Sequence, residues 1–160
     1  MATFTLTSPD IAEGRTIAAR FVHPGAGGQN VSPALAWTDP PAGTKSFAVF
    51  CHDPDAPTGG AGFWHWAATE IPAAARGLSQ GAGAAGALPT PARHWDSDYG
   101  DAAYGGPCPP PGPAHRYVFT VYALSVEKID APAGARTSLV GFLVNANTLA
   151  KASLTALFGQ

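Results

Sequence analysis

The sequence predicts a single, mainly β domain with a peripheral helix at its C-terminus. Residues 63–69 and 115–125 alternate between two faces, as β-strands do. Residues 47–51 form a short apolar run that is typical of a buried strand. The 16 prolines and 19 glycines lie between such segments, which favours turns over disorder. Towards the C-terminus the apolar spacing changes from two residues to three or four, which indicates a helix.

The expected strands can be assigned faces from their alternation. The strand that begins at Phe63 is expected to place Phe63, His65 and Ala67 on one face and Trp64, Trp66 and Ala68 on the other. The strand that begins at His115 is expected to place His115, Tyr117, Phe119, Val121 and Ala123 on one face and Arg116, Val118, Thr120, Tyr122 and Leu124 on the other. Between them, Gly77–Gly86 holds small residues that pack little, so an exposed loop is expected.

The last expected element is a helix over Thr137–Phe158. Its apolar residues recur at three- and four-residue steps: Leu139, Leu143, Ala146, Ala150, Leu154 and Leu157. Thr137 or Ser138 is expected to cap the N-terminus, because a hydroxyl oxygen can accept from a free backbone N–H group.

Composition limits the partners of the chain. Its 160 residues suit one domain, 1–160, with no repeat or linker. The net charge is −2 and charged residues make up 12%, about half the usual share. Nucleic acid is not expected as a partner, because phosphate contacts need clustered Lys and Arg. Sparse surface charge and the Ala/Leu-rich C-terminal segment favour a homodimer.

The chain is expected to be cytoplasmic. Its first residues show neither a basic segment nor a long apolar segment of the signal-peptide kind, and no apolar run is long enough for a transmembrane segment. Cys51 and Cys108 are the only cysteines. A disulfide between them is open on sequence alone, but the cytoplasm favours two free thiols.

Ionisable residues cluster around a proline-rich segment. Asp53 and Asp55 alternate with prolines, which fix φ and place the acids on a stiff loop. His65 and His115 each lie near the start of a strand and line one cavity if both strand ends open on the same side. Asp53 is expected to face a ligand and to favour a cationic imidazole, whereas Asp55 is expected to pair with Arg116.

Simpler interpretations of these residues stay open. An Asp beside Pro is a common turn former, and a His on a strand is often only packed or exposed. Tyr104–Gly112 is either a pocket wall, with glycine N–H groups free to donate, or a plain proline-rich turn. Asp96–Asp101 resembles the opening of a calcium loop, but the twelfth position is Pro107 and not Glu, so a solvated loop that leads to the pocket wall is expected.

These motifs together resemble the phosphatidylethanolamine-binding protein family, in particular its bacterial, Raf kinase inhibitor-like branch. The resemblance runs from about Phe4 to the C-terminal segment and rests on five motifs in the family's order: Gly28–Trp37, Asp53–Pro57, Phe63–Trp66, Tyr104–Gly112 and His115–Tyr117. It implies a β-sandwich-like fold and a non-enzymatic protein with a small anion pocket for phosphate or phosphoryl headgroups. It implies no cofactor, and it suggests a kinase or protease as a protein partner.

The resemblance also assigns candidate ligand-binding residues. They are Asp53, Asp55, His65, Gly106, Pro107, Cys108, Pro109, His115 and Tyr117. The family tends to have a cis peptide bond in the first motif, which would be Ala56–Pro57 here. The chain departs from mammalian members at Thr58–Gly62, where only small residues stand in place of a longer insertion, so a more open and less selective pocket mouth is expected.

Two other functions use the same residues. A hydrolase could combine Asp53, the two histidines and Cys108, although no nucleophile-elbow motif is present. A metal-dependent protein could use Asp53, His65 and His115, since two His and one carboxylate are a known ligand set, although their spacing matches no local metal motif.

Overall fold

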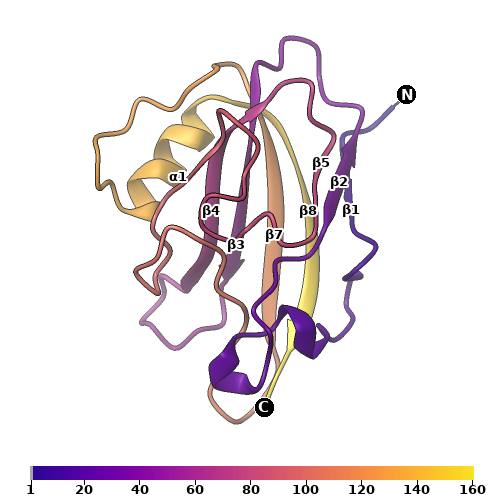
Figure 1. Ribbon diagram of the computed structural model, residues 1–160, viewed down its shortest axis with the longest axis vertical. Helices are drawn as coiled ribbons and strands as arrows, with labels where there is room; N and C mark the ends of the chain where they lie inside the picture. Colours follow the sequence, from indigo (N-terminus) through magenta and orange to yellow (C-terminus); the bar gives the residue numbers. More distant parts are fainter. Residues whose placement is uncertain (1) are drawn as a thin grey trace.

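The computed structural model describes residues 2–160 and has two antiparallel β-sheets packed face to face, with one α-helix on the outer face of the larger sheet (Figure 1). The small sheet has the order β1 (Thr5–Thr7), β2 (Leu35–Thr38) and β5 (Gly77–Leu78). The large sheet has the order β6 (Arg93–His94), β4 (Phe63–Pro72), β3 (Ser46–Asp53), β7 (His115–Leu124) and β8 (Thr148–Phe158). Two 3₁₀ turns, η1 (Ala19–Phe21) and η2 (Pro24–Ala26), precede β2, and α1 spans Thr137–Ala146. The mainly β sandwich predicted from the sequence is confirmed.

The large sheet is buried on both faces, which divides the apolar core into two layers. The layer between the sheets includes Trp37, Phe47, Val49, Trp66, Tyr117, Phe119 and Val121. The layer under α1 includes Ala48, Phe50, Ala67, Tyr122, Leu124, Val140 and Val144. Residues 47–51 are apolar without interruption because β3 lies at the centre of the sheet and contributes to both layers.

The face assignment of β7 is confirmed, but that of β4 is wrong from Trp66 onward. His52 lies opposite Trp64 and Cys51 lies opposite Trp66, so His65 is an extra residue in a β-bulge. The bulge turns His65 and Trp66 to the same side of the sheet, towards the layer between the sheets, and Ala67 to the helix side.

The predicted C-terminal helix is a helix followed by a strand. The helix α1 ends at Ala146, where Asn147 donates its side-chain amide to the Leu143 carbonyl. Residues 148–158 then pair with β7 along its whole length. Strand β7 would otherwise leave a long row of edge N–H and C=O groups unpaired, which explains why the segment is extended. The cap is also different: Arg136 occupies the N-cap position, and Thr137 donates its hydroxyl to the Asp96 carbonyl.

Two further expectations fail in part or in whole. The segment 77–86 is an exposed loop only in part, because it begins with β5 and buries Leu78, Ala82 and Gly83, whereas residues 79, 80 and 84–86 are exposed. In the described part of the chain the cis peptide bond is Thr90–Pro91 and not Ala56–Pro57. The cysteines are both free, as predicted.

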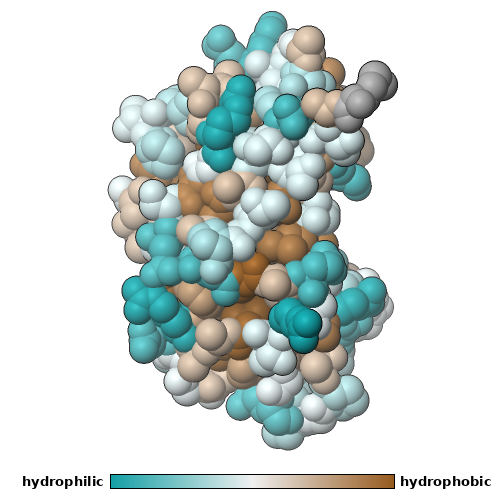
Figure 2. All heavy atoms as spheres, turned by 90° about the vertical axis from the view of Figure 1, so that its right-hand side faces the viewer, coloured by the Kyte–Doolittle hydropathy of each residue, from teal (hydrophilic) through white to brown (hydrophobic). Residues whose placement is uncertain are grey.

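The small sheet covers the core incompletely because its strands have only two to four residues. Figure 2 shows apolar side chains reaching the surface along the middle of this side of the molecule, between hydrophilic groups. No helix among residues 2–160 has the length and apolarity that crossing a bilayer requires.

Candidate functional site

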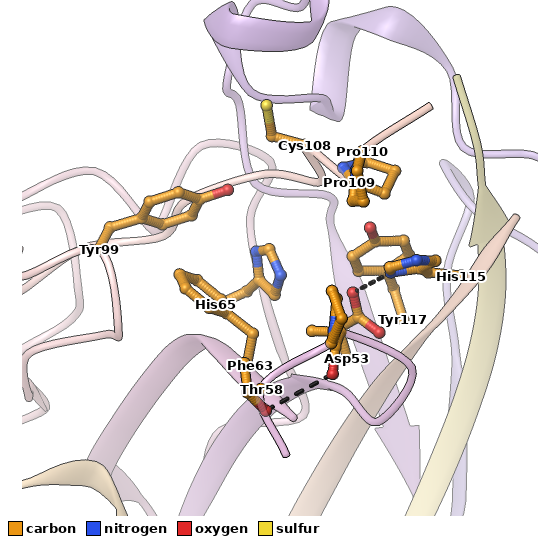
Figure 3. A pocket seen from close by; sticks show the side chains of 12 residues that line it. Asp53, Thr58, Phe63, His65, Tyr99, Cys108, Pro109, Pro110, His115 and Tyr117 are labelled. Carbon is orange, nitrogen blue, oxygen red and sulfur yellow. Dashed lines mark hydrogen bonds and ion pairs between the residues drawn. The ribbon is translucent and has the colours of Figure 1, made fainter. Parts of the chain in front are cut away.

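The candidate site lies where the C-terminal end of β3 meets the N-terminal ends of β4 and β7. These ends meet because β3 is antiparallel to both neighbours, with Asp53 opposite Phe63 and His52 opposite Val118. A cavity of about 220 Å³ opens there. Its lining residues are Asp53, Ala56, Pro57, Thr58, Phe63, His65, Tyr99, Cys108, Pro109, Pro110, His115 and Tyr117 (Figure 3).

Asp53 and His115 form a buried pair at the base of the cavity. The Nδ1 atom of His115 lies 2.7 Å from a carboxylate oxygen of Asp53, whose side chain is 3% exposed. The other carboxylate oxygen accepts from the backbone N–H of Asp55 at 2.8 Å. Because the carboxylate fixes the imidazole through Nδ1, the Nε2 atom of His115 is the nitrogen left for a ligand.

His65 is held in a similar way by the backbone. Its Nδ1 atom lies 2.8 Å from the carbonyl oxygen of Gly105, so Nδ1 carries the hydrogen and Nε2 is left for the cavity. Burial lowers the pKa of His65, and the nearby Gly105 carbonyl and Asp53 carboxylate oppose this only partly. At neutral pH we therefore expect a neutral His65. The imidazole that Asp53 contacts, for which the sequence predicts a cationic form, is that of His115.

The hydroxyl of Tyr117 is buried beside the Asp53 carboxylate, and no residue among 2–160 reaches it with the geometry of a full hydrogen bond. Burial, followed by the charge of Asp53, raises the pKa of this phenol, so it stays protonated. Buried hydroxyls are nearly always hydrogen-bonded, so this donor at the cavity wall is a candidate partner for an acceptor.

Asp55 lies outside the cavity and pairs with Arg116, as predicted. Its carboxylate accepts from the Arg116 backbone N–H at 2.8 Å and from both arms of the guanidinium at 2.8 and 3.0 Å. These hydrogen bonds hold the pKa of Asp55 at about 2. The pair is exposed and takes no part in the cavity. It holds the loop after β3 against the start of β7.

The wall segment 104–112 differs from its expected role. Cys108 and Pro109 line the cavity, but Gly106 and Pro107 lie behind it against residues 21–23 and 30. The N–H of Gly105 donates to the His65 carbonyl and that of Gly106 to the Asn30 side chain, so neither amide is free for an anion. A side chain at Gly106 would clash with the Phe21 carbonyl, which explains the glycine.

Several lining residues were not found from the sequence. Tyr99 enters from Asp96–Asp101, the segment expected to be a solvated loop that leads to the pocket wall without contributing to it. Its one signal was an aromatic residue inside an otherwise polar run. Alternation predicts the face of Phe63 but not its place in the site, and Pro110 lies inside the Tyr104–Gly112 motif, one residue beyond the last one that the resemblance assigns to the pocket.

The chemistry available in the cavity is one carboxylate, two imidazoles, two phenols, one threonine hydroxyl and a thiol in an otherwise apolar wall. No Lys or Arg is part of the lining. Within residues 2–160, no group of three or more His, Cys, Asp or Glu side chains is placed to hold one metal ion. The arrangement suits hydrogen bonding to a small polar group more than metal coordination.

Comparison with known proteins identifies the family. A family model described as phosphatidylethanolamine-binding protein matches residues 7–159. The chain is 49% identical over 156 residues to the UPF0098 protein YbhB of Escherichia coli, covering 96% of the chain and 98% of that relative. It is 38% identical over 132 residues to LppC of Mycobacterium tuberculosis, which is named as a lipoprotein, covering 82% of the chain and 60% of that relative.

A solved structure agrees with the sequence comparison. The crystal structure of Escherichia coli YbcL, described as a new member of the mammalian family, superposes with a TM-score of 0.94 at 43% identity and covers 99% of both chains. The matched residues include both strand ends that carry the histidines and the wall segment between them. The chain therefore belongs to the phosphatidylethanolamine-binding protein family.

Proposed function

We propose that the chain is a non-enzymatic protein that binds a small phosphoryl anion, free or as a headgroup, in the cavity at the end of β3, β4 and β7. The observation that carries this proposal is the convergence of three polar groups on one apolar cavity. They are the Nε2 atoms of His65 and His115 and the hydroxyl of Tyr117. The family name describes binding, which supports the same role.

The size and polarity of the cavity favour a small ligand. Its volume of about 220 Å³ lies below the roughly 300–1,000 Å³ of pockets for drug-sized molecules. A phosphoryl group offers several acceptor oxygens, and the Tyr117 hydroxyl needs one acceptor. Either imidazole can donate from Nε2 once it is protonated.

Charge balance makes binding depend on protons. Asp53 is a carboxylate inside the cavity, and burial favours the neutral form of His65. A fully ionised anion would then meet a site without net positive charge, so binding must be accompanied by proton uptake. A hydrogen phosphate ion can bring the proton itself and share it with the Nε2 atom of His65.

A non-enzymatic role is favoured by the surroundings of the imidazoles. A nucleophile–base pair needs a hydroxyl or thiol within hydrogen-bond reach of a histidine. In the described chain, the hydrogen bonds of His65 and His115 go to a backbone carbonyl and a carboxylate, and none goes to Ser, Thr or Cys.

Calorimetric titration with methyl phosphate tests the proposal. We expect binding to the wild-type protein and a loss of about tenfold or more in affinity for His65→Ala, because a charge-assisted hydrogen bond is worth roughly 1.5–3 kcal/mol. His94→Gln is the matched control, since His94 only accepts from the Trp66 indole and lies outside the cavity lining. Absence of wild-type binding would refute the proposal. Hydrolysis of p-nitrophenyl phosphate or p-nitrophenyl acetate that is lost in His115→Ala would refute the non-enzymatic role.

A further inference from the structure

The loop Asp96–Asp101 is a rigid support for Tyr99. The Trp64 N–H donates to the Asp98 carboxylate at 2.7 Å, and the Asp98 N–H donates back to the Trp64 carbonyl at 2.9 Å. Inside the loop, the Ser97 N–H donates to the Asp101 carbonyl at 2.9 Å. These bonds attach the loop to β4 immediately before His65, so the position of the Tyr99 side chain is fixed relative to the cavity.

The ring of Tyr99 is held by its neighbours. Its hydroxyl donates to the Gly106 carbonyl at 2.9 Å, and His23 stacks on it with ring centroids 4.6 Å apart and planes inclined by 13°. The rings of Phe63 and His65 approach it steeply, with centroids 4.8 and 5.4 Å away. A side chain at Gly105 would clash with the ring, so the glycine is needed for this placement.

The same ring separates two cavities. The ligand cavity of about 220 Å³ has a smaller neighbour of about 30 Å³, large enough for a water molecule. The residues that line this side chamber are His23, Asn30, Ser97, Tyr99, Asp101, Ala103, Tyr104 and Gly105. Within residues 2–160, Tyr99 is the one residue that the two linings share. Figure 3 shows its side chain reaching across the site between Cys108 and His65.

We propose that Tyr99 is the specificity-determining residue of the pocket, because its ring closes the ligand cavity on the side of the chamber and excludes the substituent of a bound phosphomonoester from that side. This inference rests on the function proposed above. Of the short segment Thr58–Gly62, Thr58 alone is part of the cavity lining, and the wall towards the chamber comes from Tyr99 on a different loop. Removal of the ring joins the cavity and the chamber and provides space for a ring that belongs to the ligand.

The test compares two esters that differ only in size, methyl phosphate and phenyl phosphate. We expect the wild-type protein to prefer methyl phosphate, and Tyr99→Ala to shift the affinity ratio towards phenyl phosphate by tenfold or more, because the phenyl ring fills the vacated apolar space. Tyr99→Phe keeps the ring and removes only the bond to Gly106, so its ratio should equal that of the wild type.

Each outcome is informative. A shifted ratio in Tyr99→Ala together with an unshifted ratio in Tyr99→Phe supports the inference. An unchanged ratio in a Tyr99→Ala protein that melts cooperatively overturns it, even if both esters bind. If Tyr99→Ala does not fold, Tyr99→Leu provides the same comparison with a smaller loss of packing. If the wild-type protein binds neither ester, the proposed function itself is refuted and this inference is refuted with it.

Discussion

Tyr117→Phe should raise stability and weaken ligand binding at the same time. The hydroxyl of Tyr117 is fully buried, and the neighbouring Asp53 carboxylate does not reach it with the geometry of a full hydrogen bond. An unpaired buried polar group costs about 1–3 kcal/mol, and its removal recovers part of that cost without loss of ring packing. We expect a gain of about 1 kcal/mol, or roughly 2–4 °C in melting temperature for a chain of this size.

The same substitution removes a donor that a phosphoryl oxygen would use. A neutral hydrogen bond is worth about 0.5–1.5 kcal/mol and a bond to a charged group about 1.5–3 kcal/mol, so the affinity for methyl phosphate should fall by about tenfold. Opposite signs for stability and affinity are typical of a group that is placed for function and not for folding.

Tyr104→Phe is the matched control. Tyr104 is also buried, but its hydroxyl donates to the Phe21 carbonyl at 2.7 Å. Its removal leaves that carbonyl unpaired and should lower stability by about 1 kcal/mol without changing ligand affinity. Chemical denaturation and calorimetric titration of both variants measure the two effects. A destabilised Tyr117→Phe, or one with wild-type affinity, would contradict the assignment of the hydroxyl to a ligand.

Three other predictions concern ion pairs, pH and assembly. His115→Ala should lower the melting temperature more than Arg116→Ala, because it leaves the buried Asp53 carboxylate unpaired, whereas Arg116 forms an exposed pair of little value; the reverse order would contradict this. Sulfate affinity should rise as pH falls from about 8 to 6 and continue to rise below 6, because burial lowers the pKa of His65 and sulfate binds the protonated form of this residue. A sulfate affinity that does not change with pH would exclude the histidines as hydrogen-bond donors to sulfate. Light scattering at micromolar concentration should give the mass of a dimer. The variant Phe142→Ser tests whether α1 forms the interface, because Phe142 is a large apolar side chain on that helix and is 71% exposed.

Local pattern was sufficient for much of the fold because strand alternation reports directly which residues face the core. The faces of β7 follow from that alternation, and the burial of β3 follows from its uninterrupted apolar run. The sequence also located both histidines and the acid pair, since prolines around Asp53 and Asp55 exclude a helix there. The pairing of Asp55 with Arg116 was predictable because both lie beside the expected pocket and carry opposite charges.

Tertiary structure decided the features that depend on long-range pairing. The segment 148–158 has apolar residues that fit a helix or a strand, and the unpaired edge of β7 selected the strand. The bulge at His65 depends on how β4 is paired with β3, and the alternation of residues within β4 carries no information about that pairing. The amides of Gly105 and Gly106 bond to protein groups far away in the sequence, and Tyr99 reaches the pocket only because its loop is attached to β4. The sequence by itself therefore determined which residues are apolar, stiff or ionisable, whereas hydrogen bonds between distant segments decided which of them face the cavity.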